Sequence, residues 1–500
     1  MTGCSVLLDG APIEALAQVR VRRMLSLPTT IEITLAGPMS ECAPDASLGA
    51  AVEISMAAHD RAPTGVSAEI VTITEHHDAS GVVATRIVAQ DRLVRLRARH
   101  SQRSFLDQSV HDHATEILAD VGLTLASEVD LGPVRRHGYQ GGADDLDHLR
   151  AVLEQVGAYL CVDEATARAV SLTPSEEVVE LGLGAELIEL TRGVTASAAP
   201  THVLASGWDL ERAAEVAADV SAATGQLPWV DLQGSTPETE PAGTHQLLLD
   251  HDALDLAGLT AAASAALLRG RALAVPVEAR ALDRPDLMPG VTCEFRDHGG
   301  VPIALGVLTL VDHRWSATGL ISRLSTAPPA SVSALSPAAT LVRGVVIGAA
   351  DPAGRGRVQV RLPTHDDALS PWLDVLVPGG DADRGLVAIP RTGATVAVLL
   401  PGGDLGRGLV LGGVLGLDGP VVGVTGGDDV TRQVWHSSRH QFLGLDDAAG
   451  TVHLRNRGGS SLRLTTDSLE LHAAGDMVIE APGRTLRIRA AAVEFEEVPS

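Results

Sequence analysis

Lysine is absent from this chain of 500 residues, so arginine must carry the 38 basic charges. Against these stand 63 acidic residues, which give a formal net charge of −25. A chain this negative repels the phosphate backbone of nucleic acids and anionic lipid headgroups alike. We therefore expect no nucleic-acid partner and no stable membrane insertion. The absence of lysine also excludes a standard P-loop, which uses a lysine to reach the phosphates.

Aromatic residues make up only 2% of the chain, although 45% of it is hydrophobic. Its cores must therefore be filled by Val, Leu, Ala and Ile, which suits several small β-rich cores better than one large core. The four cysteines, Cys4, Cys42, Cys161 and Cys293, form neither a Cys-x-x-Cys pair nor a dense disulfide framework. The sequence also lacks a run of about 18 apolar residues and an N-terminal secretory signal. We expect the chain to fold in the cytoplasm.

Hydrophobic periodicity divides the first half of the chain into β and α segments. Short alternating runs at 31–35, 69–73 and 82–88 predict strands of a barrel or sandwich. Two amphipathic helices follow, one capped by Ser109 and ending at Gly122, the other starting at Asp144 or Asp145 and ending at Gly157. Together with a strand at 159–162, they predict an α+β insertion.

The second half is expected to be mostly β. An Ala-rich helix is predicted at 259–269 with Gly270 as its stop, followed by strands at 291–295 and 305–310. Runs at 358–362, 372–377 and 395–400, separated by Gly and Pro turns, have the spacing of a small closed barrel such as an OB-fold. In the tail, short β units recur at 452–454, 462–464, 469–471, 478–479 and 486–488. Such thin units cannot bury their apolar faces alone, so we expect them to intertwine with copies of the same chain.

The predicted fold class is therefore mainly β, with an α+β insertion. The expected domains are a first β-barrel (1–100), the α+β insertion (101–170), a second β-barrel with a helix (171–330), a linker (331–340), an OB-fold domain (341–425) and a C-terminal domain of repeated β units (426–500).

Few residue clusters suggest catalysis. On a helix, His111 and His113 lie about 200° apart and cannot face one metal ion, and neighbours in the extended segment 75–78 point to opposite faces. The carboxyl pairs at 144–145 and 366–367 could serve glycoside cleavage, but a helix start and a loop are the simpler interpretations. The glycine pairs at 402–403 and 412–413 indicate tight turns. We expect no catalytic residue, no cofactor and no metal.

Four ordered motifs within 351–414 resemble a known family. They are Asp-Pro-Ala-Gly-Arg-Gly-Arg-Val-Gln-Val at 351–360, Ser-Pro-Trp at 370–372, the segment 385–396, and the glycine-containing segment 403–412. Their order and spacing are similar to the OB-fold domain of the VgrG and phage baseplate hub-spike family. Segments 87–96 and 139–149 resemble the hub portion of that family, with Gln90, Leu146 and Leu149 departing from its usual residues. The tail from 437 onward resembles the base of its β-helical needle.

The resemblance implies a structural spike and hub of a contractile injection system and not an enzyme. Its fold would be a hub of two β-barrels, an OB-fold domain and a C-terminal triple-stranded β-helix. In that family a homotrimer caps the tail tube, contacts other baseplate proteins, carries a PAAR-repeat tip protein at the spike end and leaves the cell on firing. The structural and trimer-contact candidates are Trp372, Gly354, Gly356, Pro390, Gly393, Leu462, Leu464, Leu469, Leu471, Ile479, Leu486 and Ile488.

Two other functions remain open from the residues alone. A β-rich cell-wall or polysaccharide hydrolase would need convergent carboxylates in a hub cleft. A single-strand nucleic-acid binder could use Trp372 as a stacking platform on the OB-fold, although the negative charge and the scarcity of aromatics argue against it.

Overall fold

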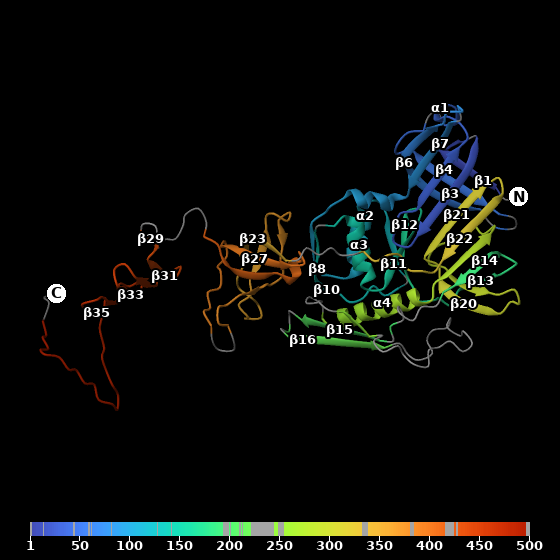
Figure 1. Ribbon diagram of the computed structural model, residues 1–500. Helices are drawn as coiled ribbons and strands as arrows, with labels where there is room; N and C mark the ends of the chain where they lie inside the picture. Colours follow the sequence, from blue (N-terminus) through green and yellow to red (C-terminus); the bar gives the residue numbers. More distant parts are fainter. Residues whose placement is uncertain are drawn as a thin grey trace. The chain divides into compact units, whose positions relative to one another are not determined.

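The computed structural model describes residues 3–496, apart from positions 14, 44–45, 59–60, 62, 82, 128, 142, 194–199, 201, 210–211, 213, 222–244, 249–254, 333–338, 381–384, 416–424 and 427–428. The chain separates into two compact units, Met1–Gly413 and Val414–Ser500. In the first unit, strands far apart in the sequence lie side by side, as Figure 1 shows for β3, β4 and β21.

An eleven-stranded sheet joins the two parts of the chain that were predicted as separate barrels. β3 pairs with β4 on one side and with β21 on the other, so the early strands and the strands after residue 277 share one hydrogen-bonded ladder. In sheet order the strands are β14 (Leu187–Arg192), β18 (Val277–Leu282), β22 (Gly319–Ser325), β21 (Leu310–Ser316), β3 (Leu16–Met24), β4 (Thr30–Leu35), β7 (Val83–Gln90), β6 (Thr64–His77), β5 (Ala51–Ala57), β1 (Gly3–Leu8) and β2 (Ala11–Pro12).

This sheet serves two separate hydrophobic cores. Alternation in β4 buries Ile31, Ile33 and Leu35 completely, in a core built from β1 and β3–β7. A second core around Phe295 collects residues of β18, β21 and β22 together with the three-stranded sheet β13 (Val178–Gly182), β19 (Thr292–Arg296) and β20 (Pro302–Val307). The continuous strand predicted at 305–310 is wrong, because the chain leaves β20 at Val307 and starts β21 at Leu310.

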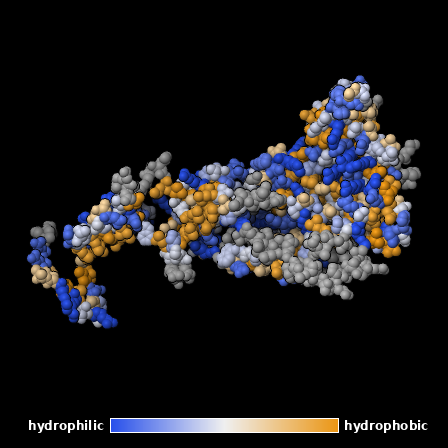
Figure 2. Space-filling model, in the orientation of Figure 1, coloured by the Kyte–Doolittle hydropathy of each residue, from blue (hydrophilic) through white to orange (hydrophobic). Residues whose placement is uncertain are grey.

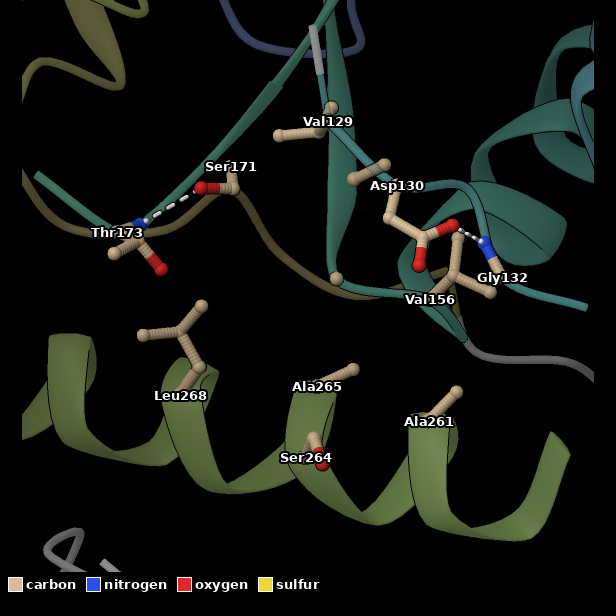
Figure 3. A pocket seen from close by; sticks show the side chains of 12 residues that line it. Val129, Asp130, Gly132, Val156, Ser171, Thr173, Ala261, Ser264, Ala265 and Leu268 are labelled. Carbon is tan, nitrogen blue, oxygen red and sulfur yellow. Dashed lines mark hydrogen bonds between the residues drawn. The ribbon is translucent and has the colours of Figure 1, made fainter. Parts of the chain in front are cut away.

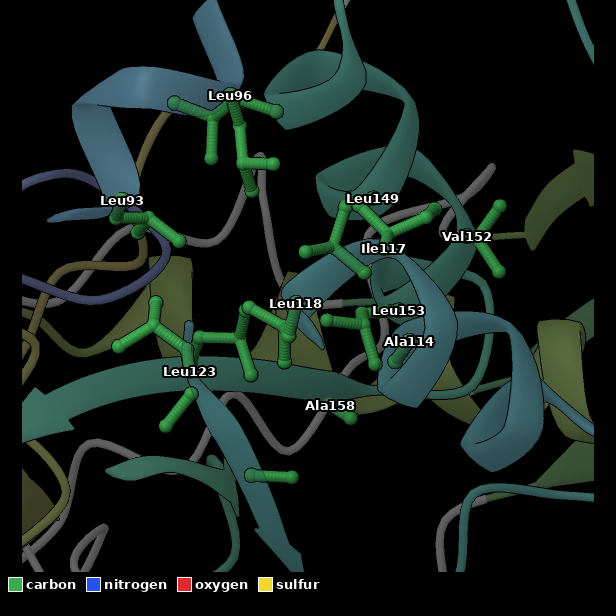
Figure 4. Close-up of a cluster of buried hydrophobic side chains, with 14 of the residues drawn as sticks. Leu93, Leu96, Ala114, Ile117, Leu118, Leu123, Leu149, Val152, Leu153 and Ala158 are labelled. Carbon is green, nitrogen blue, oxygen red and sulfur yellow. The ribbon is translucent and has the colours of Figure 1, made fainter. Parts of the chain in front are cut away.

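The α+β insertion forms a third core between two helices and a small sheet. Its elements are the 3₁₀ helix η1 (Arg92–Ala98), β8 (Arg103–Gln108), α2 (Val110–Ala119), β9 (Thr124–Ser127), β10 (Arg135–Gln140), α3 (Asp145–Glu154), β11 (Ala158–Asp163) and β12 (Thr166–Ser171). Figure 4 shows Leu118, Leu149 and Leu153 packed together in this core. Ser109 caps α2 with a reciprocal capping box and Asp144 caps α3, so both predicted helix starts are confirmed.

The Ala-rich helix α4 (Leu256–Ala274) packs on β15 (His202–Asp209) and β16 (Ala214–Ser221), with β17 (His245–Leu248) alongside β15. The prediction that Gly270 ends this helix is wrong, because the helix continues for four more residues and ends against Val275. Gly270 is therefore an interior helix residue. A glycine is tolerated inside a helix when packing supplies the stability that its flexibility removes.

Residues 339–413 form a six-stranded sheet with its own core. It consists of β25 (Ala368–Leu369), β24 (Gln359–Leu362), β23 (Ala339–Gly348), β27 (Thr395–Pro401), β28 (Leu409–Gly413) and β26 (Asp374–Val375). The strand predicted at 372–377 is reduced to the two residues of β26. Residues 333–338 of the predicted linker lie outside the described residues, and its last two residues belong to β23.

The second unit contains a five-stranded antiparallel sheet made of β31 (Arg432–His436), β32 (Phe442–Asp446), β33 (Thr451–Arg455), β34 (Ser461–Leu464) and β35 (Leu469–His472). A short hairpin, β29 (Thr425–Gly426) with β30 (Asp429–Val430), precedes it. The β units predicted at 478–479 and 486–488 are not strands here: none of the described residues from 473 to 496 is in a strand.

Candidate functional site

The Gly-rich segment of the OB domain is held by one carboxylate. Asp351 accepts hydrogen bonds from the backbone N–H groups of Ala353 and Arg355 at 3.0 Å, and from the Nε and Nη2 atoms of Arg357 at 3.0 Å. These donors hold the pKa of Asp351 well below its usual range. Gly354 and Gly356 lie at φ values of +67° and +76°, which L side chains rarely adopt.

The Ser-Pro-Trp motif fixes the next turn of the barrel through its serine. The Ser370 side chain is fully buried; its hydroxyl accepts a 2.7 Å hydrogen bond from the Val360 N–H and donates one to the Pro371 carbonyl. Trp372 is half-buried, and its ring approaches Gly348 of β23. The side chain that enters the barrel core is Leu373. Whether Trp372 contacts another subunit stays a prediction.

The turn before β27 carries the two remaining OB candidates. Gly393 has a φ of +84° and donates its N–H to the Val346 carbonyl at 2.8 Å, while Pro390, three residues earlier, is half-buried. Seven large aliphatic side chains of this domain are exposed: Leu341, Ile347, Leu369, Leu376, Leu386, Val387 and Leu411.

The sheet of the second unit has one apolar face and one polar face. The register aligns Trp435, Leu443, Leu454, Leu462 and Leu471 in one row across the five strands. Leu445, Val452, Leu464 and Leu469 form the adjacent row on the same face, because alternate residues of a strand share a face. The opposite face carries a row of Gly444, His453, Arg463 and Glu470.

Among the residues that the structure describes, none forms a layer over this apolar face. Leu454 is 52% exposed and Leu469 is 67% exposed, and none of the hydrophobic side chains described between 430 and 496 is buried. Figure 2 shows hydrophobic residues exposed over this region. Ile479, Leu486 and Ile488 are likewise exposed, beyond the last strand. The predicted trimer contacts Leu462, Leu464, Leu469 and Leu471 thus share one face of one sheet.

The carboxyl pairs singled out in the sequence have structural partners. Asp144 accepts the Asp147 N–H as the cap of α3, and the buried Asp145 accepts from Ser101, Gln140 and two arginines. These donors and the positive charge of Arg103 outweigh burial and lower the pKa of Asp145. Asp366 and Asp367 occupy a turn with positive φ, where Asp367 pairs with Arg361.

The histidine clusters do not converge on an ion. His111 is exposed and His113 is buried, so the two side chains point in different directions, which is what the helical spacing predicted. In the segment 75–78, Glu75 accepts the Met39 N–H and lies 3.6 Å from His77 on an exposed strand end. In the described part of the chain, no group of three or more His, Cys, Asp or Glu residues could hold a metal ion.

A pocket of about 230 Å³ lies between α4 and the ends of β11 and β12. Figure 3 shows Ala261, Ala265 and Leu268 of α4 facing Val129 and Asp130 across it. The Asp130 carboxylate accepts the Gly132 N–H at 2.9 Å, so it shapes its own turn. The pocket's lining contains no second acid or base.

Sequence reasoning missed the Asp351–Arg357 ion pair, the burial of His113 and the enclosed ring nitrogens of the half-buried His137 and His148. The pair was visible as an Asp followed six residues later by an Arg in a Gly-rich segment. The histidines gave no such signal, because their burial depends on elements packed from other parts of the chain.

The comparisons with known proteins agree with this architecture. The family model of the phage tail baseplate hub (GPD) matches residues 22–318. The family model of the type VI secretion system/phage-baseplate injector OB domain matches residues 342–415. None of the curated proteins matches the sequence. For the described residues, no helix has the length and hydrophobicity required to cross a membrane.

Solved structures share the fold at low identity. The 43 kDa tail protein of prophage MuSo2 from Shewanella oneidensis is 11% identical with a TM-score of 0.51, covering 66% of this chain and 99% of its own. An E. coli type VI secretion component, reported as similar to the T4 tail proteins gp27 and gp5, is 14% identical with a TM-score of 0.52. The match covers 82% of this chain and 99% of that one. A chain of the lidded Francisella PdpA–VgrG complex is 9% identical with a TM-score of 0.57, and the match covers 94% of this chain and 79% of that one.

The hub match alone spans more than half of the chain, and the OB match follows it in the order that the sequence motifs indicated. The chain therefore belongs to the phage tail baseplate hub family.

Proposed function

We propose that this chain is the hub and spike of a contractile injection system, in which three copies cap the tail tube. The spike would carry a PAAR-repeat tip protein and help to puncture a target envelope when the sheath contracts. Other baseplate proteins would surround the hub, and the role is mechanical, not catalytic. Membership of the hub family and the order of hub, OB domain and C-terminal β unit support this proposal.

The observation that carries the proposal is the uncovered apolar face of β31–β35. Burying a Leu or Val side chain contributes about 1.5–3 kcal/mol, so the rows that include Leu454 and Leu464 provide a large driving force for association. Three such sheets can enclose their apolar faces and leave the His453 and Arg463 faces in water. Closed symmetry also removes the free sheet edges that would otherwise recruit further copies without limit.

Light scattering on the purified full chain tests this arrangement. We expect a mass close to three times 51.8 kDa. Leu454→Glu places a charge on the apolar face and should reduce that mass, because burying an unpaired charge costs several kcal/mol. His453→Glu changes the neighbouring residue on the opposite face and should leave the mass unchanged.

A wild-type mass of one chain at all concentrations would contradict the proposal, and so would equal masses for the two variants. The mechanical role has its own test. Cosedimentation with tail-tube rings from the same system should retain the wild-type chain, and failure of a trimer to bind them would reject the tube-capping role alone.

A further inference from the structure

The two-stranded ribbon β8–β10 lies between the helices of the α+β insertion and the OB domain. One face of the ribbon meets α2, where the ring of His113 packs directly on Gly138 and leaves no room for a Cβ atom there. The other face meets the OB domain, where His137 packs equally closely on Gly406 of the 3₁₀ helix η3 (Leu405–Arg407). Tyr139, on the same face as His137, packs against the OB core. The ribbon therefore connects the two parts.

Three histidines are enclosed at this ribbon without hydrogen-bond partners. The Nε2 atoms of His113 and His148 and both ring nitrogens of His137 are buried, and none has a partner among the described residues. The rings of His113 and His148 are 5.7 Å apart between centroids, and Phe105 stacks on His148 at 6.4 Å. Buried polar atoms without partners are rare in folded proteins and mark sites where conditions can change the structure.

The charges around His113 and His148 oppose a further positive charge. Arg103 and Arg135 act on both rings, and the two histidines and His137 repel one another when protonated. The Asp145 carboxylate attracts a charge on His148 and the Asp112 carboxylate attracts one on His113, but both carboxylates are already engaged by other donors. On the helices themselves, His111, Glu116, Asp147 and Arg150 are the remaining ionisable residues near these rings in sequence.

The OB side adds few compensating charges. Asp404 accepts the Gly406 N–H at 2.7 Å, and burial raises the pKa of its carboxyl group, which favours its neutral form. Arg407 lies on the same short helix, and His365 lies 6.3 Å from the Tyr139 ring. A proton on His137 would therefore be placed in a site where burial opposes the charge.

We propose that the β8–β10 ribbon is an acid-released clamp: proton uptake by His113, His137 and His148 loosens the ribbon and frees the OB domain from the helices. Above neutral pH the three rings are uncharged and the clamp is closed. In acid, the open state binds protons that the closed state excludes. The hub would thus respond to an acidic compartment without any ligand.

The direction follows from the histidine environments. Burial lowers the pKa of His113 to about 3 and the pKa of His137 and His148 to about 4, below the usual value of about 6.5. The stability that neutral histidines contribute is complete above pH about 6.5 and is lost as the pH falls towards 4. Between pH 7 and pH 5, each histidine should raise the opening constant by about tenfold or more.

Hydrogen exchange of the full chain at pH 7 and pH 5, corrected for the intrinsic pH dependence of exchange, tests the clamp. Protection at 103–108, 135–140 and 405–407 should fall by about a thousandfold, which is about tenfold for each of the three histidines, and recover on neutralisation, while β4 keeps its protection. His137→Gln cannot take up the proton and should reduce this response about tenfold. His148→Gln provides a second variant should the first fold poorly.

His111→Gln is the matched control, because His111 is an exposed histidine on α2, and it should behave as wild type. Equal protection at both pH values in the wild type would overturn the proposal. A uniform loss across the first unit would also overturn it, since it would assign the effect to general unfolding, to which the buried His313 contributes. An unchanged acid response in both glutamine variants would reject these histidines as the cause.

Discussion

The hydroxyl group of Ser370 lies inside the OB barrel, where it holds the start of β24 through the Val360 N–H. Ser370→Ala leaves that buried donor without a partner, so we expect the free energy of unfolding to fall by about 1–3 kcal/mol. Denaturant unfolding followed by circular dichroism measures the change. Thr364→Ala removes a hydroxyl whose contact with His365 is exposed, and it should stay within about 0.5 kcal/mol of wild type. Equal effects would show that the buried bond contributes nothing.

For single residues, the sequence predicted which side chains of a strand are buried, but it did not predict which side chains are buried at a turn. Alternating runs located Ile31, Ile33 and Leu35 in a core, because a strand that buries one face must alternate. The motif containing Trp372 was found, but the sequence could not show that Ser370 and Leu373 are the buried residues and that Trp372 is only half-buried. Burial at a turn depends on which distant strand covers it.

At the scale of elements, a substitution in α4 tests whether Gly270 lies inside the helix, as the structure shows, or ends it, as the sequence predicted. If Gly270 is a helix-interior residue, Gly270→Ala should stabilise the first unit by about 0.5–1 kcal/mol, because alanine restricts the unfolded chain and favours the helix. If Gly270 were instead a C-terminal cap in the left-handed region, the same change would destabilise the protein. The thermal midpoint of the full chain distinguishes the two, with Gly122→Ala at φ +72° as a control that should lower it.

The starts of α2 and α3 were predictable from their caps, whereas the end of α4 was not. Ser109 and Asp144 provide local signals at the first residue of a helix, and both act as caps. Near the end of α4, Leu268 and Ala272 pack on a cluster that includes Tyr159 of β11, and the sequence around Gly270 does not show this contact. The break between β20 and β21 was missed for the same reason, since continuous apolar residues conceal a change of sheet.

For the whole molecule, the six buried hydrophobic clusters of the described residues all lie in the first unit. We therefore expect a chain ending at Gly413 to fold cooperatively by itself, with a thermal transition close to that of the full chain. Differential scanning calorimetry on both chains measures this. Loss of the cooperative transition in the shorter chain would show that the second unit is required for the fold of the first.

The pairing of β3 with β21 also has a consequence for the timing of synthesis. Arg20 and Asp312 are 292 residues apart and form a bidentate pair across this seam at 2.8 Å. At a translation rate of about 5–20 residues per second, β3 would wait roughly 15–60 s on the ribosome before its neighbour is made. During that interval its open edge could pair with another nascent chain, so we expect production of this protein to be sensitive to the supply of chaperones that shield such edges.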